Sequence, residues 1–511
     1  MRIHDRHDCS RELQAYEESS PRNFSSPTNM PDEHTSRKMS RAKRERKRSG
    51  KKQKLEGEDG LVDRISALPD DIVIGIVSLL PLKDAAATCV LSRRWEHVWK
   101  FSASLDFDED DQLFARFHGL EPDEMDPESR RYIDRVDSVI GKHRASTIER
   151  FRVCFDLDFH FTKSVDSWVE FAMNKRVQEL ELEFRSVYIL SGVRGPNWIN
   201  RNYMYQFPPK LLGLEMESGL QLKHLDSSCS IGFSFLRVLR FTNVDVSQEV
   251  LERFLYNCPV LERLSVKSTR SLVGLRVAGP SIALKYLELL SCDGLNSIQI
   301  SDTNLVSLTF SQGAEISLLL ISNAPSLVEV SYKTSRSMDL PRFLTQISRC
   351  THLEMLMLNI SVMDYDSSLV FPHFANLKHL ELTVEQDSER GLQYLLSFLE
   401  ASPYLEKLVL KLERYVTREY YKVIGNVKKM AHCPHYHLKV VKIENYRGRS
   451  CAKHVMYLIH NAAALEKIVI KPICNLGSQI VNSERQEALA RNHAMQCLKR
   501  KVPSSIEFVC M

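Results

Sequence analysis

The sequence predicts an α/β protein in which a short helical module is followed by a long array of parallel-strand repeats. Three observations lead to this prediction. Residues 61–101 contain apolar helical segments separated by a proline. An apolar triplet with the spacing L-x-x-L-x-L recurs twelve times after residue 103, and residues 1–58 hold few large apolar side chains. These patterns are typical of helices, of repeated buried strands and of a disordered segment, respectively.

Residues 1–58 are expected to form a disordered basic tail. Residues 37–54 hold eleven Lys or Arg and one acid, a local charge of about +10, whereas the whole chain carries +4. The rest of the chain is therefore mildly acidic. The block predicts a nuclear-import signal made by Lys43, Arg44, Arg46, Lys47, Arg48, Lys51, Lys52 and Lys54. A weak phosphate-binding arm and a solubilising charge run remain alternatives, although no aromatic side chains interleave the block to favour nucleic-acid readout.

The module at residues 61–101 begins with a predicted helix from Asp70 to Leu80, directly after Leu68-Pro69. On a helical wheel its apolar residues cover an arc of roughly 220°, about twice the stripe that an amphipathic helix shows its own core. A second helical run, Lys83 to Leu91, supplies one apolar partner. Because about 40 residues with a single cysteine are near the lower size limit for independent folding, we expect the second partner to be another chain.

Three motifs in this module, LPDDI (68–72), LLPLKD (79–84) and VLSRRW (90–95), are followed by Val98-Trp99. In this order they resemble the F-box, a three-helix module that docks on a Skp-family adaptor of cullin ubiquitin ligases. The resemblance implies an adaptor interface made by Leu68, Pro69, Ile72, Ile76, Leu80, Pro81, Val90, Leu91 and Trp95. An ordinary helical hairpin within a core is the alternative, and it leaves the wide apolar arc unexplained.

The apolar triplets have the strand pattern of leucine-rich repeats, and they predict an irregular solenoid over residues 103–430 that continues into the C-terminal region. They begin at Val177, Leu211, Leu236, Leu261, Leu284, Leu305, Leu327, Leu353, Leu377, Leu405, Leu438 and Leu465. Alternation along a strand points the apolar residues inward. Each repeat then buries three or four apolar side chains, which stabilises it only when neighbouring repeats cover both faces. Amphipathic helices are expected before several strands, at Val250–Tyr256, Leu392–Leu399 and Ala452–Ile459.

Both ends of such an array need caps. Ala103–Phe107 alternates like an edge strand directly after the helical module, whereas Glu484–Lys499 and Ser505–Val509 predict a closing helix and strand. Residues 431–511 include Cys433-Pro434, His437–Val441, Asn461-Ala462 and Leu465–Ile468. These segments resemble the FBD region found at the end of many plant F-box proteins. The helix before Asn461 departs from that region, because it carries Cys451–His454 where the family usually has acidic residues.

No catalytic, metal or cofactor site is expected. The cluster His432–His437 has no closed four-ligand spacing for zinc, and Asp106–Asp111 lacks the glycine and the final glutamate of an EF-hand loop. Phosphate-binding and common hydrolase motifs are absent from the sequence. Twelve cysteines without a C-x-x-C pair, and no apolar run of about 18 residues, favour a reduced, soluble compartment and no membrane partner.

The F-box resemblance implies a non-enzymatic subunit that joins a Skp-family adaptor, and through it a cullin, to a protein target for ubiquitination. The basic tail predicts the nucleus, with the cytoplasm as a second compartment. Two alternatives remain open: a nuclear repeat scaffold outside ubiquitin transfer, and a receptor gated by a small molecule. The second requires basic residues on consecutive strands, but the candidates Arg237/Arg240, Arg263/Lys267 and Lys407/Lys411 are scattered.

Overall fold

The computed structural model describes residue 65 and residues 67–92, 94–108, 122–157, 159–184, 204–216, 222–224, 232–312, 318–333, 340–359, 371–385, 389–413, 434–448, 452–473 and 483–511. The predicted basic tail, with all eight residues of the proposed import signal, lies outside these residues. Residues from Ala67 onward form one compact unit, to which everything below refers. Within the described residues, no helix combines the length and the hydropathy needed to cross a membrane.

The helical module begins this unit. It consists of α1 (Asp70–Ser78), α2 (Leu82–Ala87), η1 (Thr88–Val90), α3 (Trp95–Val98) and η2 (Trp99–Phe101). Its core is a separate small cluster made by Val73, Val77, Ala85, Trp95 and Val98. A core of this size is much smaller than that of an independently stable domain. The predicted three-helix module is confirmed, and the first helix ends two residues earlier than expected.

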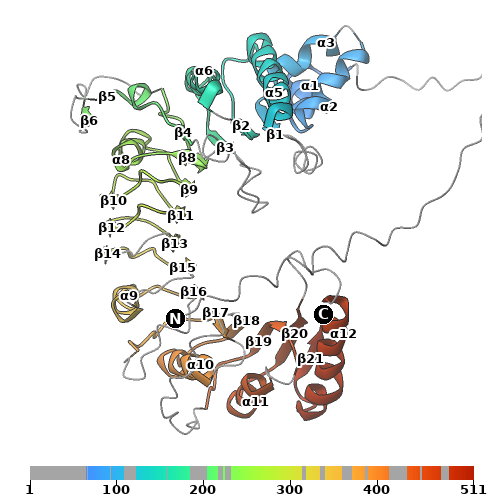
Figure 1. The fold of residues 1–511 in the computed structure, drawn as a ribbon, viewed down its shortest axis with the longest axis vertical. Helices are drawn as coiled ribbons and strands as arrows, with labels where there is room; N and C mark the ends of the chain where they lie inside the picture. The colour runs from blue at the N-terminus through green and yellow to red at the C-terminus, as the bar shows by residue number, and fades with distance from the viewer. Residues whose placement is uncertain are drawn as a thin grey trace, which may run out of the picture. The chain divides into compact units, whose positions relative to one another are not determined.

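A fourteen-stranded parallel sheet follows, and its strands lie side by side in chain order. Its members are β1 (Ser104–Asp108), β2 (Arg150–Phe155), β3 (Glu179–Phe184), β7 (Val238–Thr242), β9 (Arg263–Lys267), β11 (Tyr286–Cys292), β13 (Ser307–Gln312), β15 (Glu329–Lys333), β16 (Met355–Asn359), β17 (His379–Glu385), β18 (Lys407–Glu413), β19 (Val440–Tyr446), β20 (Lys467–Pro472) and β21 (Glu507–Cys510). Each of these strands pairs with the next member of this sheet, because consecutive repeats stack (Figure 1). The predicted repeat architecture is confirmed.

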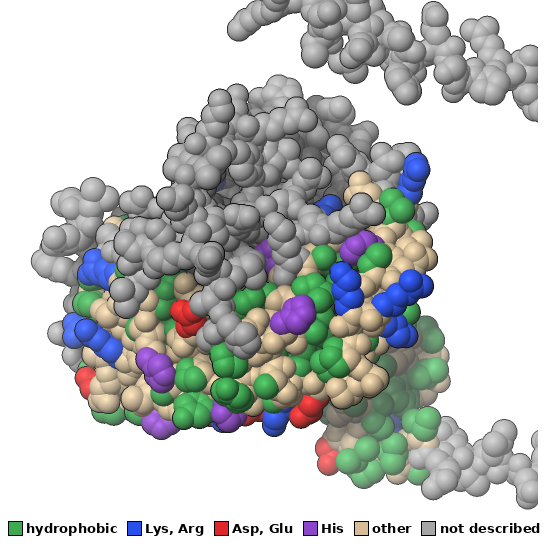
Figure 2. Space-filling model, turned by 90° about the horizontal axis from the view of Figure 1, so that it is seen from below, with side chains coloured by type: hydrophobic (Ala, Val, Ile, Leu, Met, Phe, Trp, Pro, Cys, Tyr) green, Lys and Arg blue, Asp and Glu red, His purple; other side chains and the backbone are tan. Residues whose placement is uncertain are grey.

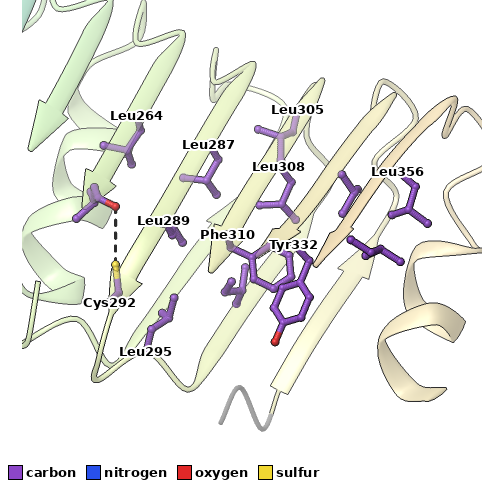
Figure 3. Close-up of a cluster of buried hydrophobic side chains, with 14 of the residues drawn as sticks. Leu264, Leu287, Leu289, Cys292, Leu295, Leu305, Leu308, Phe310, Tyr332 and Leu356 are labelled. Carbon is purple, nitrogen blue, oxygen red and sulfur yellow. Dashed lines mark hydrogen bonds between the residues drawn. The ribbon is translucent and has the colours of Figure 1, made fainter. Parts of the chain in front are cut away.

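The register of the sheet places equivalent residues of the repeats next to one another. Leu264 pairs with Leu287, Leu287 with Leu308, Leu308 with Val330, and Val330 with Leu356. Figure 3 shows four of these side chains, Leu264, Leu287, Leu308 and Leu356, on neighbouring strands. All five residues are almost completely buried. The leucine triplets thus form one continuous core, in which every repeat covers the apolar side chains of the next.

The surface opposite the main sheet changes along the array. Helices α8 (Gln248–Asn257), α9 (Leu340–Ile347), α10 (Glu389–Ala401) and α11 (Ala452–Asn461) cover part of it, as predicted for three of the four. Between α8 and α9 lies a three-stranded parallel sheet instead, formed by β10 (Gly274–Ala278), β12 (Ser297–Ser301) and β14 (Leu318–Ser322). The triplets are closest together here, and such short repeats leave room for a strand but not for a helix.

The prediction was wrong for the triplet Leu211/Leu214/Met216. It forms η4 (Pro209–Leu212) and β5 (Leu214–Met216), and β5 pairs antiparallel with β6 (Leu222–His224) outside the main sheet. Conversely, Ile148, Phe151 and Val153 are buried, and the last two lie in the unpredicted repeat strand β2. The same hydrophobic spacing serves both strands, so only the pairing partner distinguishes a repeat strand from a local hairpin.

Both predicted caps are present. At the front, β1 is the first strand of the sheet, flanked by α5 (Pro122–Lys142), η3 (Phe159–Phe161) and α6 (Thr162–Asn174). At the back, α12 (Ser483–His493) leads through η8 (Ala494–Leu498) and η9 (Lys499–Lys501) into β21, which pairs with β20. Two further short strands, β4 (Tyr205–Gln206) and β8 (Val244–Asp245), pair beside β3 and β7.

Candidate partner-binding surfaces

Helix α1 divides its apolar side chains between two environments. Val73 and Val77 are completely buried in the core of the module, whereas Ile72 is 48% exposed, Ile76 42% and Leu79 86%. Helical periodicity separates the two groups, because 73 and 77 lie one turn apart on one side and 72, 76 and 79 lie on the other. The wide apolar arc of the sequence therefore becomes a filled core on one side and an open surface on the other.

Residues that follow α1 and residues that follow α2 add to the exposed apolar side chains. Leu80 is 39% exposed, Val90 83% and Leu91 64%, while Pro69 and Pro81 are also exposed and Leu68 is half-buried. We name as the apolar face the set Ile72, Ile76, Leu79, Leu80, Val90 and Leu91. Isolated apolar side chains are common on protein surfaces, but six on a segment of 20 residues are typical of an interaction site.

Trp95 was assigned to the adaptor interface, but it lies in the core of the helical module. It is only 7% exposed and packs with Val73 and Val77 in the module's own core, so it supports the apolar face from behind. Leu79 shows the opposite difference, because it was not among the predicted interface residues and yet is 86% exposed. The wheel already placed Leu79 in the apolar arc, and that signal was sufficient to include it.

Arg94 fixes the start of α1 against the end of the module. Its Nε donates a hydrogen bond of 2.8 Å to Asp70 Oδ1, and its guanidinium also donates to the carbonyl oxygen of Leu68. Charge-assisted hydrogen bonds are about twice as strong as neutral ones. The arginine of the VLSRRW motif thus positions the Leu68-Pro69 segment, which itself borders the apolar face.

The module is also joined to the first repeat. The backbone N–H of Ala103 donates to Ser78 Oγ (3.1 Å), and that of Arg144 donates to the carbonyl oxygen of Lys100 (2.7 Å). The Nε2 of His143 lies 3.0 Å from the carbonyl oxygen of Ser102, and burial lowers the pKa of His143 below its usual value. A neutral imidazole that donates to this carbonyl therefore helps to hold the junction.

The outward face of the main sheet begins with charges that neutralise one another. Arg152 on β2 lies 2.6 Å from Asp108, 3.2 Å from Glu181 and 3.3 Å from Glu183. Burial alone would lower the pKa of Arg152, but the neighbouring carboxylates raise it above the usual value. Burial raises the pKa of Asp106 despite the two arginines beside it. These side chains already have partners within the chain, so they offer little charge to a ligand.

The basic residues considered for an anion pocket are mostly paired as well. Ion pairs join Arg237 to Glu262, Arg240 to Glu181, Lys267 to Glu288 and Lys411 to Glu381. Arg263 instead stacks over the ring of Tyr286, with 4.1 Å from its Cζ to the ring centroid. This arrangement argues against a pocket in which these residues jointly bind a polyanion.

No group of three metal-ligating side chains is brought together within the described part of the chain. His435 is buried and its backbone bridges to Asn461 and Ala463, whereas His437 contacts the ring of Tyr404. Figure 2 shows histidine side chains scattered over one face rather than gathered. Asp106 and Asp108 lie in β1 as strand residues; His432, Cys433 and the acids after Asp108 fall outside the described residues.

Comparisons with known proteins agree with this architecture. Residues 65–105 match the F-box domain model, and residues 139–508 match the model described as At1g61320/AtMIF1, LRR domain. The Arabidopsis thaliana F-box/FBD/LRR-repeat protein At5g22660 is 24% identical over 459 residues, which cover 85% of this chain and 93% of that protein. The FBD-associated F-box protein At4g10400, also from Arabidopsis thaliana, is 29% identical over 68% of this chain and 77% of its own length.

A helical module with an open apolar face, fused to stacked leucine-rich repeats, defines an F-box protein of the leucine-rich-repeat class. The chain belongs to the family described by the At1g61320/AtMIF1 LRR domain, and it is a plant-type F-box protein with an FBD-type C-terminal region. The resemblance inferred from the motifs is thereby confirmed.

Proposed function

We propose that this protein is the substrate-recognition subunit of a Skp-cullin-F-box ubiquitin ligase. Its helical module would bind a Skp-family adaptor, and its repeat array would bind a protein target. The single observation that carries the proposal is the apolar face of the module, which no described part of the chain covers. Fully burying one such side chain contributes about 1.5–3 kcal/mol, so a partner that covers six of them gains a substantial driving force.

The proposed role requires no catalytic group in this chain. The module is hydrogen-bonded to the first repeat through Ser78 and Lys100, so a target on the array would be held at a restricted distance from the adaptor. Restricting that distance raises the effective concentration of a target lysine near the ubiquitin carrier without new chemistry. The junction and the array thus supply proximity, and the remaining subunits supply the reaction.

The test is co-purification of the full chain with a Skp-family adaptor. The double variant Leu79→Asp, Leu91→Asp places two charges on the apolar face, and we expect it to weaken adaptor binding by at least tenfold. Tyr256→Asp is the matched control, because Tyr256 is 82% exposed on α8, outside the module. Full adaptor binding by the double variant, with thermal unfolding unchanged, would contradict the proposal.

The basic segment leads to a proposal about location. We expect residues 43–54 to direct import into the nucleus, because clustered Lys and Arg are typical of import signals. Replacing the eight basic residues of the block by alanine in a fluorescent fusion should shift the protein toward the cytoplasm. As the control, the same number of Lys and Arg residues can be replaced on the described surface, which should leave the distribution unchanged.

A further inference from the structure

A shallow cavity of 390 Å³ lies on the outward face of the central strands. Its wall and floor include Arg263 on β9, Tyr286 on β11, Ser307 and Thr309 on β13, and Glu329 on β15. Four of these residues occupy one row of the sheet, because the register pairs Arg263 with Tyr286, Tyr286 with Ser307, and Ser307 with Glu329. The row therefore reads cation, aromatic ring, hydroxyl and carboxylate across four neighbouring strands.

The residues at the two ends of this row, Arg263 and Glu329, are charged and form no ion pair with the described residues. Glu329 is partly exposed and Arg263 is exposed. Arg263 stacks on Tyr286, which orients the guanidinium but does not neutralise it. The other charges of the cavity are occupied, since Arg240 lies 3.6 Å from Glu181 and Glu288 lies 3.2 Å from Lys267.

The separation of the two available charges fits an extended polypeptide. Neighbouring strands lie about 4.8 Å apart, so three spacings separate Arg263 from Glu329 by about 14 Å. In an extended chain, side chains on one face recur at every second residue, and positions i and i+4 lie about 13 Å apart. A segment crossing the strands would thus place residue i at one charge, residue i+2 over Tyr286 and Ser307, and residue i+4 at the other charge.

We propose that this row recognises an extended segment of the target protein that carries an acidic residue and a basic residue four positions apart. The acidic side chain binds Arg263, the basic side chain binds Glu329, and the intervening side chain contacts the ring of Tyr286. This inference rests on the proposed function, since it names the chemistry of the segment that the repeat array presents to the ligase.

The probes for a test are fluorescein-labelled peptides of the sequence Ser-Gly-Glu-Ser-Leu-Ser-Lys-Gly-Ser. Two relatives carry two Glu or two Lys at the charged positions, and a third places Glu and Lys two residues apart. Anisotropy titrations use the full chain. We expect it to bind the first peptide about fivefold more tightly than each relative, a factor within the range of a partly exposed ion pair.

Charge reversal should change the preference in a defined way. Glu329→Lys should favour the peptide with two Glu, and Arg263→Glu should favour the peptide with two Lys. Arg276→Glu, on the exposed side of β10, and Glu400→Lys, on α10, are matched controls that should keep the original preference. Arg263→Gln and Glu329→Gln should lose discrimination without reversing it.

Equal binding of all four peptides by the wild type, or an unchanged preference in both reversal variants, would overturn the inference. Adaptor binding is measured on the same samples, which separates the two proposals. Normal peptide preference with no adaptor binding would refute only the ligase assignment, whereas normal adaptor binding without peptide preference would refute only the recognition row.

Discussion

The helical module and the repeat array use the same apolar residue types for opposite purposes. In the array, Leu308 is completely buried between the equivalent residues of the preceding and following repeats. In the module, Leu79 is 86% exposed, although it belongs to an equally apolar segment. A repeat has neighbours on both sides, whereas the module contacts the array on one side and leaves the other open. The apolar side chains of the array are therefore buried within the chain, whereas part of those in the module remain exposed.

A similar contrast exists along the outward face of the sheet. Near the module, Arg152 is surrounded by carboxylates within the chain, whereas at the centre Glu329 and Arg263 lack ion-pair partners among the described residues. Charges that are paired internally stabilise the local structure, and charges left available determine what a ligand must carry. In both regions, the residues that the fold leaves without partners are those that we propose for binding to other proteins.

The largest expected loss of stability comes from a substitution in the small core of the module. Trp95→Ala removes the largest of its five buried side chains, and such substitutions cost about 3–5 kcal/mol. Because four remaining buried residues cannot compensate, we expect residues 70–101 to unfold while the array stays folded. Limited proteolysis should then cleave within the module first, and adaptor binding should be lost. Protection of residues 70–101 equal to that of the wild type would show that the module is more strongly supported by the array than its core indicates.

The next effect concerns the array. Leu308→Ala creates a cavity in the continuous core and should lower the free energy of unfolding by about 2–4 kcal/mol. Urea unfolding followed by circular dichroism measures this change, and adaptor binding should be unaffected because the module has its own core. Thr345→Ala, at an exposed position of α9, serves as the control and should change stability little.

A smaller effect on the free energy of unfolding is expected from pH, through one histidine at each end of the array. Burial lowers the pKa of both His143 and His435 below 6.5. At these two histidines the unfolded chain then binds more protons than the folded one near and below pH 6.5, so their contribution to stability is constant well above this pH and falls as the pH decreases through it. The loss is at most about 1.4 kcal/mol per histidine for each pH unit. Thermal unfolding between pH 7.5 and 5.5 measures it, and the His143→Gln, His435→Gln variant should give a flatter profile.

The smallest expected effect on stability is that of Leu79→Ala. Since Leu79 is largely exposed, its truncation should change the free energy of unfolding by less than about 0.5 kcal/mol. The same variant should nevertheless weaken adaptor binding several-fold, as measured by titration calorimetry. A large loss of stability would mean that the apolar face serves the fold and not a partner, and it would remove the contrast between the two regions.

Much of the fold was predictable because its signals are local and repeated. Strand triplets such as Leu261/Leu264/Val266 recur with the same spacing, and every predicted triplet except Leu211/Leu214/Met216 became a strand of the main sheet. The hairpin strand at Leu214 shows where this reasoning ends, because its triplet fits the pattern but its pairing partner is local. The strands opposite the main sheet, such as β12, were not predicted, since their short apolar pairs are too weak a signal on their own.

The sequence by itself determined the order of the parts, the helices and most strands of the array, and the excess of apolar surface in the first helix. These properties depend on residue spacing along a single segment, which the chain carries at every point. Only the tertiary structure decided that Trp95 faces inward, that Leu79 faces outward, and that Arg263 and Glu329 share one row. Side-chain environment across strands depends on register and on neighbouring repeats, and these are set by packing between segments far apart in the sequence.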